Sequence, residues 1–283
     1  MPELPEVEAL ARSLSSTLAG EEVTRIELGA LSALKTFDPP LEALVGRLLG
    51  GVGRKGKFLL LQAGAGAPAD PAGGLWLVVH LALGGWIRWR PQLPPARARP
   101  GRGPLALRLG LSGGGGLEVT EAGTEKRLAL WVVRRPEDVG PLAALGPDPL
   151  APGFTGADLG AALQGRTGHI KGVLTDQRVV AGVGNAYSDE VLHAARLSPF
   201  KPAAKLTGEE LGRLHVALVE VLGAALARSD GLAPSALKAE KRTGMAVHGR
   251  AGLPCPVCGD TVREVSFASK AFQYCPTCQT GGK

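Results

Sequence analysis

The chain has 283 residues, which is enough for one large domain or two modest ones. Its hydrophobic content of 45% and charged content of 20% are typical of a globular protein, and its net charge of +6 favours a polyanionic partner. The first residues lack the basic and apolar regions of a secretory signal, and no apolar run is long enough to span a bilayer. We therefore expect a cytoplasmic protein with no membrane partner.

The first half of the chain predicts one helix followed by short strands. The helix is expected over 5–19, because Val7, Leu10, Leu14 and Leu18 fall on one face. Glycine- and proline-rich stretches at 64–74 and 91–104 are expected to be loops. The strands are expected at 22–29, 57–63, 74–83, 85–90, 105–111, 116–120 and 127–134. This pattern predicts an antiparallel β-sandwich with a flanking helix.

The second half of the chain predicts helices, followed by a small cysteine-containing segment. Thr207 and Glu210 form a capping-box pattern at the start of one helix. The helices are expected near 156–164, 168–177, 186–196 and 207–226. The fold class is therefore α+β. We expect domains over 1–135, 153–240 and 241–283, with a proline-rich hinge over 136–152.

All four cysteines lie in the last 29 residues, as two C-x2-C pairs: Cys255 with Cys258, and Cys275 with Cys278. Each pair brings two thiolates onto one tight turn, and two such turns complete a tetrahedral site for Zn²⁺. A site closed by four thiolates has no open position for a substrate. The spacing therefore predicts one structural zinc in a β-hairpin ribbon. The alternative is four unrelated cysteines, which the regular spacing disfavours.

The amino terminus places carboxylates beside a potential secondary amine. If Met1 is removed, the nitrogen of Pro2 becomes the free terminus, and a neutral terminal amine can attack a sugar C1′ or an aldehyde. Glu3 follows directly and can transfer protons to or from the sugar. The alternative interpretation is that this early proline and glutamate only begin a helix.

Three separated motifs together resemble one protein family. They are Pro-Glu-Leu-Pro-Glu-Val-Glu at 2–8, Gly-Val-Gly-Asn-Ala-Tyr-Ser-Asp-Glu at 182–190, and the cysteine ribbon. In this order they resemble the formamidopyrimidine-DNA glycosylase/endonuclease VIII family. The resemblance implies a β-sandwich, a helix–two-turn–helix module and a zinc ribbon, with double-stranded DNA bound in the cleft between the halves. It also implies a monomer, expected in the bacterial cytoplasm or nucleoid.

The resemblance further implies an activity in base-excision repair. The enzyme would remove an oxidised base and cleave the resulting abasic site by β- or β/δ-elimination, through an iminium on Pro2. By position, Pro2 would be the nucleophile, Glu3 the proton-transfer residue and Lys57 a lysine that contacts phosphate. Glu6 would support the site, although a carboxylate there also suits a helix start.

Further DNA contacts are implied for Lys171, Gly184, Asn185, Leu83 and Lys270. Glycines in the turn at 182–184 would let backbone amides approach a phosphate, and Asn185 could donate a hydrogen bond.

The chain departs from the family pattern at its DNA contacts. Lys270 stands where the family has arginine, Leu83 stands where it has methionine, and the segment 120–128 has no aromatic wedge. A weaker wedge predicts a preference for lesions that already pair poorly. A clear preference for 8-oxoguanine opposite cytosine over oxidised pyrimidines in one duplex context would contradict this hypothesis.

Two other functions fit parts of the same pattern. One is a non-catalytic damaged-DNA-binding protein of the same fold, and the other is an RNA-associated protein that shares the helical module and the ribbon. The five histidines form no metal-binding spacing in the sequence, so His193 and His215 are expected to be packing or surface residues. His248 is a candidate for a backbone phosphate contact.

Overall fold

The computed structural model describes residues 1–64, 74–101, 103–267 and 270–282, without the side chains of Phe267 and Lys270. The chain divides into two compact units. The first unit contains residues 1–2, 6–143 and 231–237, and the second contains 3–5, 144–230 and 238–283. Within the described ranges, none of the helices combines the length and the hydropathy that crossing a membrane requires.

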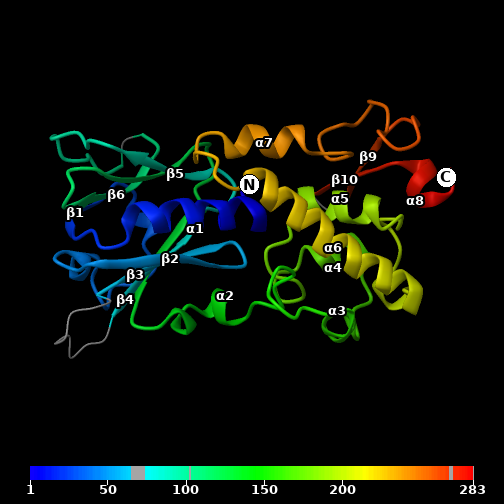
Figure 1. The fold of residues 1–283 in the computed structure, drawn as a ribbon, viewed down its shortest axis with the longest axis horizontal. Helices are drawn as coiled ribbons and strands as arrows, with labels where there is room; N and C mark the ends of the chain where they lie inside the picture. Colours follow the sequence, from blue (N-terminus) through cyan, green and yellow to red (C-terminus); the bar gives the residue numbers. More distant parts are fainter. Residues whose placement is uncertain (65–73, 102, 268–269, 283) are drawn as a thin grey trace. The chain divides into compact units, whose positions relative to one another are not determined.

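Two four-stranded antiparallel sheets form most of the first unit (Figure 1). One has the order β1 (Val23–Leu28), β6 (Leu105–Leu111), β7 (Gly116–Glu121) and β5 (Gly85–Arg90). The other has the order β2 (Leu49–Lys55), β3 (Phe58–Ala63), β4 (Leu75–His80) and β8 (Ala129–Val133). The predicted antiparallel sheets are confirmed. Most of the loop predicted at 64–74 lies outside the described residues.

Helix α1 (Leu4–Leu18) follows the predicted apolar pattern, and Leu10, Leu14 and Leu18 are buried. Strand β2 was not predicted, because its three glycines weaken the strand pattern. Its pairing with β3 compensates, as do contacts with α1: the Ser15 hydroxyl accepts from the amide of Val52 (3.2 Å), and Arg54 pairs with Glu8 at 2.7 Å. Long-range contacts thus form β2 where local sequence does not favour it.

The second unit is built mainly from α3 (Gly156–Leu163), α4 (Ile170–Leu174), α5 (Asn185–Ala194) and α6 (Gly208–Ser229). Both α3 and α6 begin with a capping box, from Thr155 and Thr207 respectively. The apolar faces of these helices share one core with Leu4. The unit ends in the ribbon hairpin of β9 (Arg263–Phe267) and β10 (Lys270–Tyr274), followed by α8 (Pro276–Thr280).

Several short elements were not predicted. They include α2 (Gly140–Ala143), the 3-10 turns Leu31–Ala33, Leu41–Leu44, Pro136–Asp138 and Ala203–Lys205, and the helix α7 (Leu237–Thr243). Residues 231–237, which include the first residue of α7, belong to the first unit. There the carbonyl of Pro234 accepts a hydrogen bond from the indole N–H of Trp86 at 3.2 Å. The rest of α7 belongs to the second unit and is tied to α6 by the ion pair of Arg228 with Glu240, at 3.0 Å.

Candidate active site and zinc ribbon

The carboxylate of Glu3 is held at the first turn of α5. It accepts hydrogen bonds from the backbone amides of Gly184 (2.5 Å), Ala186 (3.0 Å) and Tyr187 (3.3 Å). Its side chain is buried, and the amino end of a helix favours a negative charge. The amides that we expected to meet a phosphate therefore bind Glu3, and the two separated sequence motifs form one cluster.

The glycine-rich turn has the shape that this cluster needs. Gly182 has a φ of +87°, and a Cβ at this position would lie 2.6 Å from the Cβ of Leu4. The amide of Leu4 donates to the carbonyl of Gly182 at 3.0 Å. The side chain of Gln177 braces the turn, donating to the carbonyl of Val183 (2.7 Å) and accepting from the amide of Gly182 (3.0 Å). Gly182 thus lets the amino-terminal segment approach the turn.

The other residues expected at the site lie in the first unit. Pro2 precedes Glu3 directly and is buried. Glu6 is buried in the first turn of α1, and Lys57 is buried in the tight turn between β2 and β3. Their catalytic roles stay predictions.

His80, at the end of β4, has an environment that disfavours its charged form. Burial, together with the nearby ammonium of Lys57, lowers the pKa of this imidazole from 6.5 to about 4. Its ring packs against Phe58 on the paired strand β3, with ring centroids 4.7 Å apart. His80 is therefore neutral near pH 7, beside the charged ammonium of Lys57.

We expect this histidine to make the first unit less stable in acid. Between about pH 6.5 and 4 the unfolded chain protonates His80 and the folded chain does not, so stability is lost as the pH falls. Between pH 7 and pH 5 the contribution is roughly 1–2 kcal/mol. Urea unfolding of wild type and His80→Gln at both pH values measures it. Equal losses of stability in the two proteins would contradict the expectation.

Leu83 lies at the tip of the tight turn between β4 and β5, and 53% of its surface is exposed. The neighbouring Ala82 adopts a φ of +50°, and a Cβ on Gly84 would lie 2.1 Å from the carbonyl oxygen of Ala122. The amide of Ala122 also donates to the carbonyl of Gly84 at 3.1 Å. The turn therefore presents an exposed apolar side chain on a closely packed support.

The structure places Lys171 in the core, contrary to our expectation of a DNA contact. Its side chain is fully buried; the ammonium lies 2.5 Å from the carboxylate of Asp189 and donates to the carbonyl of Ala271 at 2.6 Å. It also lies 4.8 Å from the centre of the Phe272 ring. A buried ammonium with these partners is not available to a phosphate. Lys171 instead joins α4 and α5 to strand β10.

The adjacent acidic residues of α5 hold the segment that leads into the ribbon. Glu190 accepts from the amides of Ala246, Val247 and His248, at 2.7–2.9 Å. Burial raises the pKa of Glu190, although these three hydrogen bonds oppose the shift. Asp189 lies 2.9 Å from Nδ1 of His248 and accepts from the amide of Gln273 at 3.2 Å. The His248 ring therefore faces Asp189 through this nitrogen.

The four cysteines come together as the spacing predicts. The sulfur of Cys255 lies 3.9 Å from that of Cys278, and the sulfur of Cys258 lies 3.4 Å from that of Cys275. Zn–S bonds of about 2.3 Å in a tetrahedron place sulfur atoms about 3.8 Å apart, so the cluster fits one structural zinc. Nε2 of His193, on α5, lies 3.3 Å from the sulfur of Cys255. Sequence spacing could not reveal this neighbour, because 62 residues separate the pair.

Two expected DNA contacts differ in how far the structure describes them. The side-chain oxygen of Asn185 is buried, and it has no hydrogen-bond partner in the described part of the chain. Lys270 begins β10, but its side chain lies outside the described residues. The roles of both residues in DNA binding stay predictions.

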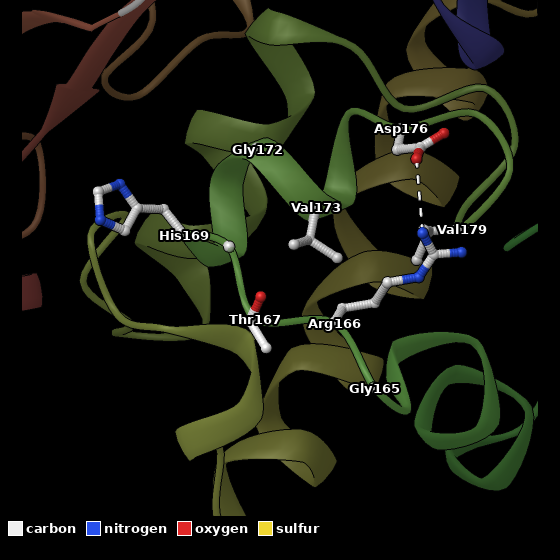
Figure 2. A pocket seen from close by; sticks show the side chains of 9 residues that line it. Gly165, Arg166, Thr167, His169, Gly172, Val173, Asp176 and Val179 are labelled. Carbon is white, nitrogen blue, oxygen red and sulfur yellow. Dashed lines mark ion pairs between the residues drawn. The ribbon is translucent and has the colours of Figure 1, made fainter.

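A separate pocket lies beside α4 (Figure 2). Its lining includes Gly165, Thr167, Val173 and Asp176, and Arg166 reaches across it to within 3.8 Å of the Asp176 carboxylate. Neither Glu3 nor any residue of the α5 amino end lines this pocket. We assign no function to it.

Three family models match successive parts of the chain. The formamidopyrimidine-DNA glycosylase N-terminal domain matches residues 1–125, and the H2TH (helix–two-turn–helix) domain of the same glycosylase matches 145–235. The zinc finger found in FPG and IleRS matches 252–281.

Several curated relatives cover nearly the whole chain, and another covers half of it. The formamidopyrimidine-DNA glycosylase of Thermus thermophilus is 37% identical and that of Moorella thermoacetica 36%, covering 100% and 94% of both chains respectively. An uncharacterized formamidopyrimidine-DNA glycosylase-like protein of Mycobacterium tuberculosis is 62% identical over 140 residues, which is 50% of this chain and 87% of that protein.

Solved structures of Fpg proteins are similar to this chain over nearly its whole length. The crystal structure of the MutM (Fpg) protein of Thermus thermophilus is 34% identical, with a TM-score of 0.80 over 98% of both chains. The Lactococcus lactis enzyme complexed with abasic-site DNA is 26% identical, with a TM-score of 0.84 over 98% of this chain and 99% of that one. A β-sandwich, an H2TH module and this zinc finger together define the architecture of a DNA glycosylase. The chain belongs to the formamidopyrimidine-DNA glycosylase family.

Proposed function

We propose that this protein is a base-excision-repair enzyme that removes oxidised bases from double-stranded DNA and then cleaves the abasic site. The carboxylate of Glu3, fixed by three backbone amides of α5, is the observation that carries the proposal. In the proposal this carboxylate is the acid–base group, and it follows Pro2 directly in the chain. Membership of the family, the net charge of +6 and the exposed Leu83 support a DNA substrate.

In the proposed reaction the Pro2 nitrogen attacks C1′ of the deoxyribose while the bond from C1′ to the damaged base breaks. The base leaves with the bonding electron pair, and the proton that the attacking amine loses neutralises it. Glu3 supplies the proton that opens the sugar ring, leaving a cationic iminium between C1′ and Pro2. The cation withdraws electrons, so the C2′ proton is lost and the 3′-phosphate leaves. Lys57 contacts a phosphate, and Leu83 fills the space left by the extruded nucleotide.

Reductive trapping tests the proposal. With abasic-site DNA, borohydride adds hydride to the iminium, so the wild-type protein is expected to form a stable covalent adduct. Intact-mass measurement first establishes whether Met1 has been removed, because the test requires a free Pro2 nitrogen. The matched control carries one extra residue before Pro2, which turns its nitrogen into an amide and is expected to prevent the adduct.

The outcomes separate the alternatives. Equal adduct from both proteins would show that another amine is the nucleophile. No adduct from a correctly processed wild type that still binds damaged DNA would favour the non-catalytic damaged-DNA-binding protein instead.

A further inference from the structure

Lys241 contacts the Glu3 carboxylate. Its ammonium nitrogen lies 3.3 Å from Oε1 of Glu3, and 15% of the Lys241 side chain is exposed. The same nitrogen lies over the ring of Tyr187, 4.6 Å from the ring centre. Tyr187 also donates its backbone amide to Glu3. Lys241 therefore lies between the carboxylate and an aromatic face, two environments that both favour a cation.

Helix α7 holds Lys241 in this position. The neighbouring residue Glu240 pairs with Arg228 of α6 at 3.0 Å, which fixes one side of the helix. Gly244 follows the last residue of α7 and lies close to the same guanidinium. A Cβ at this position would lie 2.4 Å from Nη2 of Arg228. The next residue after Lys241, Arg242, is exposed. One cation of α7 is thus directed at Glu3, while its neighbour faces solvent.

The contact has a consequence for proton transfer. The groups that contact Glu3 include the backbone amides of Gly184, Ala186 and Tyr187 from α5 and the ammonium of Lys241 from α7. The amides are permanent donors, whereas Lys241 contributes a full charge at low exposure, where Coulomb interactions are strong. An adjacent cation makes a carboxylate bind a proton less readily.

We propose that Lys241 is a positioning residue for Glu3: it orients the carboxylate and sets its proton affinity during the reaction. This inference rests on the proposed function, in which Glu3 transfers a proton to the sugar. Lys241 acts through Glu3, so it should affect the chemical step more than DNA binding.

Single-turnover cleavage of abasic-site DNA, measured across a pH range, tests this inference. In Lys241→Met, the limb of the pH–rate profile that belongs to Glu3 is expected to move to higher pH by about one unit. Because a larger fraction of Glu3 is then protonated, the rate at neutral pH is expected to rise by up to about tenfold, whereas the Kd for DNA should change much less. Lys241→Arg keeps the charge and is expected to restore most of the wild-type profile. Arg242→Met makes the same charge change on the same helix and should leave the limb in place.

The results distinguish this inference from the proposed function. A wild type that forms the borohydride adduct, with Lys241→Met showing the same profile, would refute the role of Lys241 alone. A slower Lys241→Met with an unmoved limb and no rescue by arginine would indicate a purely structural role and overturn the inference. If Lys241→Met does not fold by circular dichroism, Lys241→Gln is measured in its place. A wild type without the adduct would overturn the proposed function itself.

Discussion

Replacing Glu3 by glutamine is expected to slow excision of a damaged base by about 10²–10⁴-fold, the usual contribution of a positioned acid–base group. Glutamine has nearly the same shape and keeps one oxygen to accept from the α5 amides, so the fold should change little. The side-chain nitrogen of the glutamine would face backbone N–H groups of α5. Two donors cannot hydrogen-bond to each other, so the cluster would be weakened. The measurement is single-turnover excision at saturating enzyme.

Its control separates chemistry from stability. Glu42→Gln removes a carboxylate from the 3-10 turn Leu41–Leu44 of the first unit and is expected to excise like wild type. Thermal unfolding of both variants shows whether either loses stability. A Glu3→Gln protein that excises within threefold of wild type would remove Glu3 from the proposed mechanism.

Replacing Lys171 by methionine is expected to destabilise the second unit by about 3–5 kcal/mol, because it leaves the buried carboxylate of Asp189 without its cation. Methionine is similar in volume, so the loss is mainly electrostatic. Strand β10 also loses the hydrogen bond from the ammonium to the carbonyl of Ala271. Denaturant unfolding measures the change.

A double replacement is the matched control for this prediction. Lys171→Met combined with Asp189→Leu removes both charges and is expected to recover part of the lost stability, because neither member is left unpaired. If the double variant is destabilised by the full sum of the two single variants, the pair contributes no coupling energy and the electrostatic explanation is wrong.

Local signals predicted much of the architecture. The two C-x2-C pairs predicted the zinc site, because four ligands in two short motifs need little information from the rest of the chain. Among the described residues, the strand pattern predicted seven of the eight sandwich strands, and the capping box at Thr207 predicted the start of α6. Strand β2 was missed because its glycines carry no pattern, and pairing with β3 is a long-range effect.

The arrangement of the candidate site depends on contacts between residues far apart in the chain. Gly184 lies 181 residues from Glu3 in the chain, so no spacing rule could show that the Glu3 carboxylate accepts hydrogen bonds from the backbone amides of this turn. Lys171 was expected to contact DNA because the family resemblance implied it, and its buried partner Asp189 lies on the next helix, where no local pattern links the two. Lys241 carries no motif, and only the position of α7 brings it to Glu3.

The contact of Leu4 with Gly182 also bears on how the protein can be produced and labelled. Leu4 is fully buried and Glu3 nearly so, which makes the first residues part of a folded core and not a free tail. Met1 is exposed, so an affinity tag, fluorescent protein or surface linker at this end would be joined one residue before the buried segment, and it would turn the Pro2 nitrogen into an amide. The amino terminus is therefore an unsuitable attachment point.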